Sequence, residues 1–267
     1  MLSRFSPFRK GRPDPQDRQR AYAIGDIHGR LDLLDDILQR IEADDAKRPE
    51  AKTTIVFLGD LVDRGPQSAQ VVERLRRYRP EFASTVFLMG NHEEVLLRIV
   101  GGETEVIGDW LKFGGAECVR SYGVDPADLQ CRSPSDVPRI LRQAIPKEHL
   151  KFLASFVDTA SFGRYLFVHA GIRPGVSLSH QIPQDLRWIR QPFLENDSDH
   201  GRVVVHGHTI SESIEVKANR IGIDTGAYRT GILTALGVEG EERWFLQTGD
   251  VDRLRAALGR VANLQPA

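Results

Sequence analysis

GDIHG at residues 25–29, GDLVDRG at residues 59–65 and GNHE at residues 90–93 are the stretches that decide the fold of this chain. Each follows a short apolar run that is typical of a buried strand, and each precedes a segment whose apolar residues recur at helical spacing. This alternation predicts a β-α-β-α-β-α unit with a parallel sheet and right-handed crossovers. The expected strands are residues 21–24, 54–58 and 85–88, and the expected helices are residues 31–41, 67–78 and 92–100.

The polar residues of the three stretches should meet at one place. Each stretch lies where an expected strand ends and a helix begins. In a parallel sheet these junctions share one edge, and that edge is where open α/β sheets bind their ligands. We therefore expect the functional site there.

The remaining sequence predicts a helical insertion and a second sheet. Gly101-Gly102 breaks the pattern, and irregular helical sequence up to about residue 146 predicts a small cap inserted into a single domain of residues 21–262. A helix is expected over residues 146–157, followed by a buried strand over residues 165–168. The later short strands suit a second, largely antiparallel or mixed sheet, before a final helix. These strands are residues 203–205, 213–216, 221–223, 232–236 and 243–246, and the helix is residues 251–261.

Composition excludes several classes of partner. The 267 residues include 36 basic and 37 acidic side chains, and a formal net charge of −1 creates no field that attracts nucleic acid or membrane. No stretch approaches the roughly 18 apolar residues of a membrane span. Without an apolar leader, we expect a cytoplasmic protein whose two cysteines, Cys118 and Cys131, are reduced thiols; one disulfide is the alternative. Residues 1–20 suit a solvated, poorly ordered basic tail, with a docking arm for an acidic partner as the alternative.

The residue types at the strand ends suit a pair of divalent metal ions. Carboxylate, amide oxygen and imidazole together are accepted by ions such as Mn, Fe or Zn. If Asp60 bridges the two ions, one ion takes Asp60 together with Asp26 and His28. The other ion takes Asp60 together with Asn91, His169 and His208. Such a pair can bind a hydroxide nucleophile and clamp an in-line phosphoryl displacement. The candidate ligands are Asp26, His28, Asp60, Asn91, His169 and His208.

Three neighbours of these ligands suit proton transfer and phosphate binding. His92, paired with Asp63, is a candidate protonated imidazole that delivers a proton to the leaving oxygen. Arg64 offers a fork of donors for phosphate oxygens. His206 ends the same strand as His208, and we interpret it as a packing residue or as support for a ligand.

The order of these motifs resembles that of the calcineurin-like metallophosphoesterases. Within them it is similar to the bacterial phosphoprotein phosphatase branch, which also contains the symmetrical diadenosine tetraphosphatases. The resemblance implies a four-layer α/β/β/α fold, two divalent ions and attack by a metal-bridging hydroxide without a phosphoenzyme. Mn²⁺ is the ion implied by the branch, with Fe or Zn as alternatives.

Carried over residue by residue, the resemblance assigns a role to each matched position. It implies the six ligands given above, His92 as general acid, Asp63 as its orienting partner and Arg64 as a phosphate-binding residue, with Asn91 also facing the phosphate. The segment LRWIR at residues 186–190 resembles a Trp-x-Arg element. This implies Arg190 as a second phosphate-binding arginine, with Arg187 as its competitor.

Two departures from the family pattern narrow the expected substrate. Ile210 stands where many phosphodiesterase and nuclease relatives carry a second histidine, which favours monoester or pyrophosphate substrates over nucleic acid. Met89 stands where the eukaryotic phosphatases carry arginine. The sequence thus predicts a metal-dependent phosphatase acting on phosphoserine, phosphothreonine or phosphotyrosine in proteins. The alternative is a symmetrical diadenosine tetraphosphate hydrolase.

A catalytically silent protein that binds phosphorylated ligands is an alternative of another class. A missing ligand or acid would be its expected sign, but every matched position is filled. Among the remaining polar and aromatic residues, Trp110 and Trp188 are expected in the core, with a substrate platform as the alternative for Trp188. Asp224 suits either a turn or a hydrogen bond to a ligating imidazole, and His149 is expected on the surface.

Overall fold

A computed structural model describes residues 18–249 of the chain. The expected tail therefore lies, up to residue 17, outside the described residues, as does the expected helix over residues 251–261. The first strand already begins at Gln19. The domain bounds at residues 21–262 extend past the described part and stay a prediction.

The three expected strands form the parallel half of a five-stranded sheet with the order β10-β9-β1-β2-β3. The parallel strands are β1 (Gln19–Ile24), β2 (Lys52–Phe57) and β3 (Ala83–Phe87). The helices that follow them are α1 (Leu31–Lys47), α2 (Ser68–Arg76) and α3 (Asn91–Gly101). Each helix lies where its apolar periodicity predicts it, within a few residues at each end except for the C-terminal end of α1.

A second five-stranded sheet has the order β4-β5-β6-β8-β7. Strands β5, β6 and β8 run parallel to one another, and β4 and β7 pair antiparallel at the two edges. The sheet is mixed, as expected. Its strands are β4 (Thr159–Phe162), β5 (Tyr165–Val168), β6 (Val203–His206), β7 (Glu215–Val216) and β8 (Arg220–Gly222).

The last two expected strands belong to the first sheet, so their assignment to the second was wrong. β9 (Thr234–Glu239) pairs antiparallel with β1, and β10 (Glu242–Gln247) pairs antiparallel with β9. Local sequence pattern identifies a strand, but a strand's partner depends on burial against residues far away in the chain. Here Leu236 and Val238 enter the same core between the sheets as Ala21 of β1.

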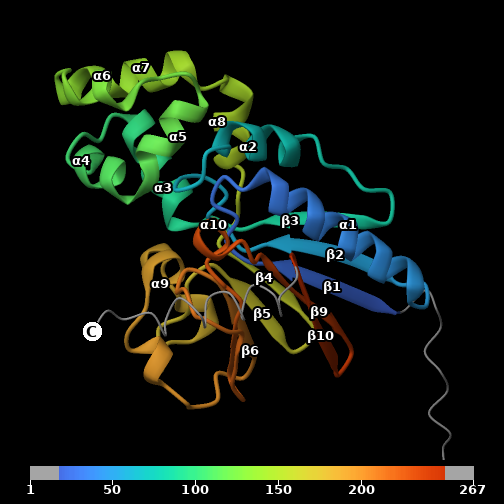
Figure 1. Cartoon of the computed structure of the whole chain (residues 1–267). Coiled ribbons are helices and arrows are strands. Elements are labelled where there is room, and N and C mark those ends of the chain that lie inside the picture. The colour runs from blue at the N-terminus through green and yellow to red at the C-terminus, as the bar shows by residue number, and fades with distance from the viewer. Residues whose placement is uncertain (1–17, 250–267) are drawn as a thin grey trace, which may run out of the picture.

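Alternating side chains on β1 show how the layers are built. Ala21 and Ala23 face the core between the two sheets, whereas Tyr22 and Ile24 face the core under the helices. The outer face of the second sheet packs against α9 (Pro183–Trp188) and the turns that follow it. The order of layers is therefore helix, sheet, sheet, helix (Figure 1), which confirms the expected α/β/β/α fold.

Short helices fill the segment expected to form a cap. Figure 1 shows α4 to α7 gathered on one side of the molecule, beyond α2 and α3 and away from both sheets. Helix α5 contacts α2, and α7 contacts α3. The elements are α4 (Ile107–Trp110), the π-helical turn η2 (Leu111–Gly115), α5 (Ala116–Ser121), α6 (Pro126–Gln130), the 3₁₀ turn η3 (Pro134–Asp136), α7 (Val137–Ala144) and α8 (Lys147–Leu153).

A buried histidine joins three of these helices. The ring of His149 lies 3.0 Å from the Tyr122 hydroxyl and 3.0 Å from the Glu73 carboxylate, so α8 is tied to α2 and to the residue that follows α5. The expectation that His149 lies on the surface was wrong, because its polar partners come from helices distant in sequence. Both cysteines are free, as expected. Among the helices of residues 18–249, none has the length and apolar character to span a membrane.

Candidate metal centre

Each of three candidate ligands lies on a sharply turning loop that follows a strand. His28, Asp60 and His208 come after β1, β2 and β6, and their φ angles are 45°, 51° and 61°. Left-handed φ angles are uncommon for residues other than glycine, and each costs about 1–3 kcal/mol of strain. We interpret these strained turns as the feature that directs the three side chains toward a common point.

Glu93 fixes the loop that carries Asp60 against the start of α3. Its buried carboxylate accepts the backbone N–H groups of Asp60, Leu61 and Gly90 at 2.8, 2.7 and 3.1 Å. A Cβ atom on Gly90 would overlap with the carboxylates of Asp60 and Glu93, so only glycine fits there. Sequence analysis missed Glu93, although glutamate at the third helical position is a capping-box signal that could have identified it.

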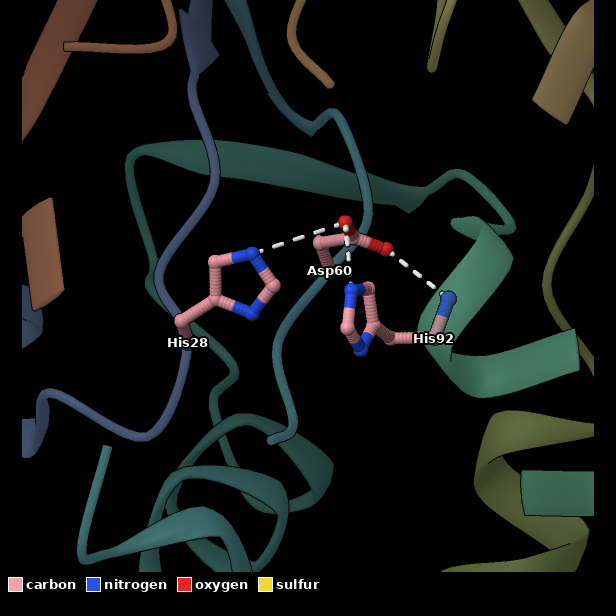
Figure 2. Close-up of side chains that lie close together, drawn as sticks. All are labelled: His28, Asp60 and His92. Atoms are coloured by element: carbon pink, nitrogen blue, oxygen red, sulfur yellow. Dashed lines mark hydrogen bonds and ion pairs between the residues drawn. The ribbon is translucent and has the colours of Figure 1, made fainter. Parts of the chain in front are cut away.

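Asp60 lies between two groups of potential metal ligands. It forms one group with His28 and His92 and another with His169 and His208, and within each group the ligand atoms lie within 4.8 Å of one another. The Asp60 carboxylate is 3.5 Å from His28 Nε2 and 3.4 Å from His169 Nε2. Figure 2 shows this carboxylate between the rings of His28 and His92. A carboxylate shared by two groups suits a pair of metal ions.

Backbone carbonyl groups orient two of the imidazole rings. Nδ1 of His28 and Nδ1 of His169 each lie 2.8 Å from a carbonyl oxygen, those of Val62 and Leu58. These contacts place the proton on Nδ1 and leave Nε2 as the free ligand atom. Within the described part of the chain, the buried Nε2 atom of His28 has no hydrogen-bond partner, whereas the nitrogen of His208 that faces the other ligands is Nδ1. Buried polar atoms normally have such a partner, so Nε2 of His28 fits metal ligation.

Asn91 lies beside the second ligand group, whereas Asp26 belongs to neither group. Asn91 Oδ1 is 3.0 Å from His169 Nε2 and 2.9 Å from His208 Nδ1, so it belongs with the second group. Asp26 is a member of neither group, and its carboxylate accepts the backbone N–H of His208 at 3.0 Å. Burial, followed by the charge of Asp224, raises the pKa of Asp26 well above its usual range. A cation beside Asp26 would favour its ionised form.

The local electrostatics favour the metal-binding forms of His28, Asp60 and His208 but not that of His169. Burial opposes the imidazolium of His169, but the Asp60 carboxylate outweighs it and raises the pKa of His169. Burial lowers the pKa of His28, and burial together with the charge of His169 lowers the pKa of His208 to about 2. Burial opposes ionisation of Asp60, but the charges of His169 and His92 outweigh it and hold the pKa of Asp60 well below its usual range. Neutral imidazoles and ionised carboxylates are the forms that ligate metals.

His92 and Asp63 are in contact, as the sequence predicts. His92 Nδ1 lies 2.6 Å from Asp63 Oδ2, and Trp110 Nε1 donates to the same oxygen at 2.9 Å. Burial disfavours the imidazolium, but the carboxylates of Asp60 and Asp63 outweigh it and raise the pKa of His92. From the sequence, Trp110 was expected to be a core residue and nothing more. Its polar contact was missed because Asp63 lies 47 residues earlier in the chain.

The site opens into a cavity of about 420 Å³ that is lined in part by Arg64, His92 and Arg190. Arg64 Nη2 lies 3.1 Å from His92 Nε2. The competing arginine, Arg187, instead bonds two carboxylates at 2.7 and 3.2 Å. Of the two arginines in this segment, Arg190 faces the cavity.

His206 and Asp224 lie outside both ligand groups. The ring of His206 packs 5.2 Å from the ring of Phe193, in line with its interpretation as a packing residue. Asp224 Oδ1 accepts the backbone N–H of Gly226 at 2.9 Å, which is the geometry of the turn alternative. Burial raises the pKa of Asp224 to about 6.

Comparison with known proteins identifies the family. The sequence profile of the calcineurin-like phosphoesterases matches residues 20–255, which is most of the chain. The chain belongs to the calcineurin-like phosphoesterase family. It is therefore a phosphoesterase, and its histidine and aspartate groups fit the divalent metal ions of this family.

Curated relatives of this calcineurin-like phosphoesterase carry different substrate names. The asymmetrical bis(5′-nucleosyl)-tetraphosphatase PrpE of Bacillus velezensis is 26% identical, over 90% of this chain and 98% of the relative. Serine/threonine-protein phosphatase 2 of Escherichia coli is 26% identical, over 80% of this chain and 90% of the relative. A symmetrical bis(5′-nucleosyl)-tetraphosphatase of Neisseria gonorrhoeae is 26% identical, over 83% and 93%.

A solved structure shares the fold of this phosphoesterase. It is provisionally assigned as a diadenosine tetraphosphatase, and it superposes with a TM-score of 0.61. The two sequences are 21% identical, and the match covers 86% of this chain and 94% of that one. At this identity the likeness shows the fold alone.

Proposed function

We propose that this phosphoesterase is a dinuclear-metal phosphatase that removes phosphate from phosphoserine and phosphothreonine, and also from phosphotyrosine, in proteins. One observation carries the proposal: the two ligand groups that share Asp60 border a cavity onto which Arg64, His92 and Arg190 converge. A phosphoryl group there meets cationic donors and a proton donor together.

The proposed ligand sets extend the two groups: Asp26 replaces His92 in the first, and Asn91 joins the second. Asp26, His28 and Asp60 would hold one ion. Asp60, Asn91, His169 and His208 would hold the other. Divalent ions supply Lewis acidity that polarises the phosphoryl group and lowers the pKa of water. Mn²⁺ is the proposed ion, and the ligand types would also accept Fe or Zn.

His92 is proposed to deliver the proton to the leaving oxygen. Because Nδ1 of His92 is held by Asp63, Nε2 lies on the side of Arg64 and the cavity. A guanidinium can only donate, so Nε2 accepts from Arg64 in the observed contact, and Nε2 would carry the transferable proton once a phosphate oxygen takes the N–H of Arg64. Arg64 Nη2 and His92 Nε2, 3.1 Å apart, would both donate to a phosphate oxygen placed between them. Arg190 and Asn91 are proposed to hold the remaining phosphoryl oxygens.

Hydrolysis of dinucleoside tetraphosphates is a second candidate function. It is favoured by the names of the relatives from Bacillus velezensis and Neisseria gonorrhoeae. The same residues would act on a pyrophosphate bond, because only the leaving group differs.

Removal and return of metal tests the proposed chemistry. Metal-stripped protein should hydrolyse para-nitrophenyl phosphate only after a divalent ion is added back, with Mn²⁺ restoring the highest rate when compared with Zn²⁺, Mg²⁺ or no addition. Turnover of a phosphoserine peptide should then exceed that of diadenosine tetraphosphate. A large preference for the dinucleotide would contradict the phosphoprotein assignment and support the second candidate. No hydrolysis with any ion would contradict both.

Arg187 in α9 and Arg190 just after it provide a matched pair of variants that tests the phosphate-binding role. Arg190→Ala should raise KM for para-nitrophenyl phosphate by about 10- to 100-fold, because a hydrogen bond to a charged group contributes about 1.5–3 kcal/mol. Arg187→Ala should leave KM unchanged, because its guanidinium is bonded to Asp158 and Glu94 rather than directed at the cavity. An unchanged KM in Arg190→Ala, measured by steady-state kinetics, would contradict the assignment.

A further inference from the structure

Phe113 has the most exposed large hydrophobic side chain among residues 18–249, with 67% of its surface accessible. It lies in η2 and lines the cavity that contains Arg64 and His92. The other four exposed large hydrophobic residues of this part of the chain do not line that cavity. Burying a phenyl group stabilises a complex by about 1.5–3 kcal/mol, so an exposed ring at a cavity wall is suited to contact a ligand.

The backbone of η2 fixes the position of Phe113 relative to Arg64, a proposed phosphate-binding residue. The next residue, Gly114, has a φ angle of 117°, and its carbonyl oxygen accepts the backbone N–H of Arg64 at 3.0 Å. A Cβ atom on Gly114 would lie 2.5 Å from the backbone nitrogen of Arg64. This close approach is open only to glycine. The phenyl ring is therefore presented from a turn that is directly attached to a proposed phosphate-binding residue.

The cavity lining combines apolar residues with the carboxylates of Glu105 and Asp109. Val95, Val106 and Trp188 line the cavity together with Phe113. Trp188 Nε1 donates to Glu94 at 3.2 Å, which fixes the indole ring. The nearby cation in this wall, Arg98, is paired with two glutamates and adds no free positive charge. The cavity therefore offers cationic donors for a phosphate and apolar surface for a flat group.

We propose that Phe113 is a specificity-determining residue that packs against a flat aromatic ring in the leaving group of those substrates that carry one. The inference rests on the proposed phosphoester hydrolysis and adds a substrate class to it. Two sources supply such a ring: the tyrosyl ring of a phosphotyrosine and the base of a nucleoside polyphosphate. Phe113 gains by offset or edge-to-face packing with either ring, whereas an alkyl phosphate offers no ring.

Competitive inhibition of para-nitrophenyl phosphate hydrolysis tests this role. Phenylphosphonate is compared with methylphosphonate for the tyrosyl ring, and adenosine diphosphate is compared with pyrophosphate for the base. In the wild type, the ring-bearing inhibitor of at least one pair should have the lower inhibition constant. Phe113→Ala should reduce that advantage by about 2- to 10-fold, the range expected for one aromatic pair. The pair that responds identifies the source of the ring.

Three control variants separate the aromatic ring from simple bulk and from folding. Phe113→Trp should keep the advantage, Phe113→Leu should lose most of it, and Leu178→Ala, at an exposed apolar residue outside the cavity, should behave like the wild type. Because Phe113 is exposed, its truncation should leave the melting temperature unchanged. Equal changes for both members of each pair, or no change at all, would overturn the inference. Wild-type protein that is inactive with every metal would overturn the proposed function instead. In that case the Kd values of the ring-bearing and ring-free ligands of each pair, measured by calorimetry, would still decide the role of Phe113.

Discussion

Asp60→Asn should lose bound metal and about 10³-fold or more of kcat/KM for para-nitrophenyl phosphate. Asp60 is the one residue present in both ligand groups, so its replacement removes a charged ligand from both ions at once. Lewis-acid stabilisation by a metal is worth several kcal/mol, and each 1.36 kcal/mol of barrier is tenfold in rate. Metal content per chain after dialysis, measured by mass spectrometry, and steady-state kinetics check the two effects.

The substitution is chosen to leave the backbone intact. Asparagine tolerates the left-handed conformation that Asp60 adopts, and its side-chain oxygen can still accept the backbone N–H of His92. The matched control is Asp185→Asn, the same chemical change at a buried carboxylate that binds Arg173 outside the site. This control should keep full metal content and rate. Full metal occupancy in Asp60→Asn would contradict the bridging role.

His92→Asn should keep its metal but slow substrates with poor leaving groups by about 10²–10⁴-fold, the usual contribution of a general acid. An alkyl phosphomonoester such as a phosphoserine peptide needs its leaving oxygen protonated. The nitrophenolate leaving group needs little help, so para-nitrophenyl phosphate should be slowed far less. The observed contacts place His92 Nε2 where this requires it, since Asp63 holds Nδ1 and His92 lines the cavity.

Two measurements accompany this variant. Kinetics on aryl phosphates with leaving groups of increasing pKa should show a steeper dependence in His92→Asn than in the wild type. Trp110→Phe, which keeps the ring but removes the N–H donated to Asp63, should steepen the dependence in the same direction and to a smaller extent. An equal loss on good and poor leaving groups in His92→Asn would argue against the general-acid assignment.

The sequence alone determined the alternation of strands and helices and the location of the site. Apolar periodicity is a local property, so the strands β1 to β3 and the helices after them could be predicted from short windows. Because each polar motif follows such a strand, His28, Asp60 and His92 could be expected at one edge before any contact was known. The order of the motifs also indicated the family, which the profile match confirms.

Only the tertiary structure decided which distant segments meet. The placement of β9 beside β1, the contact of Trp110 with Asp63 and the turn that attaches Gly114 to Arg64 join residues far apart in the chain. The choice of Arg190 over Arg187 as the cavity-facing arginine was likewise open, since both lie in the same short segment. Side chains commit to such contacts only when packing brings their partners near, and no local pattern records which partner that is.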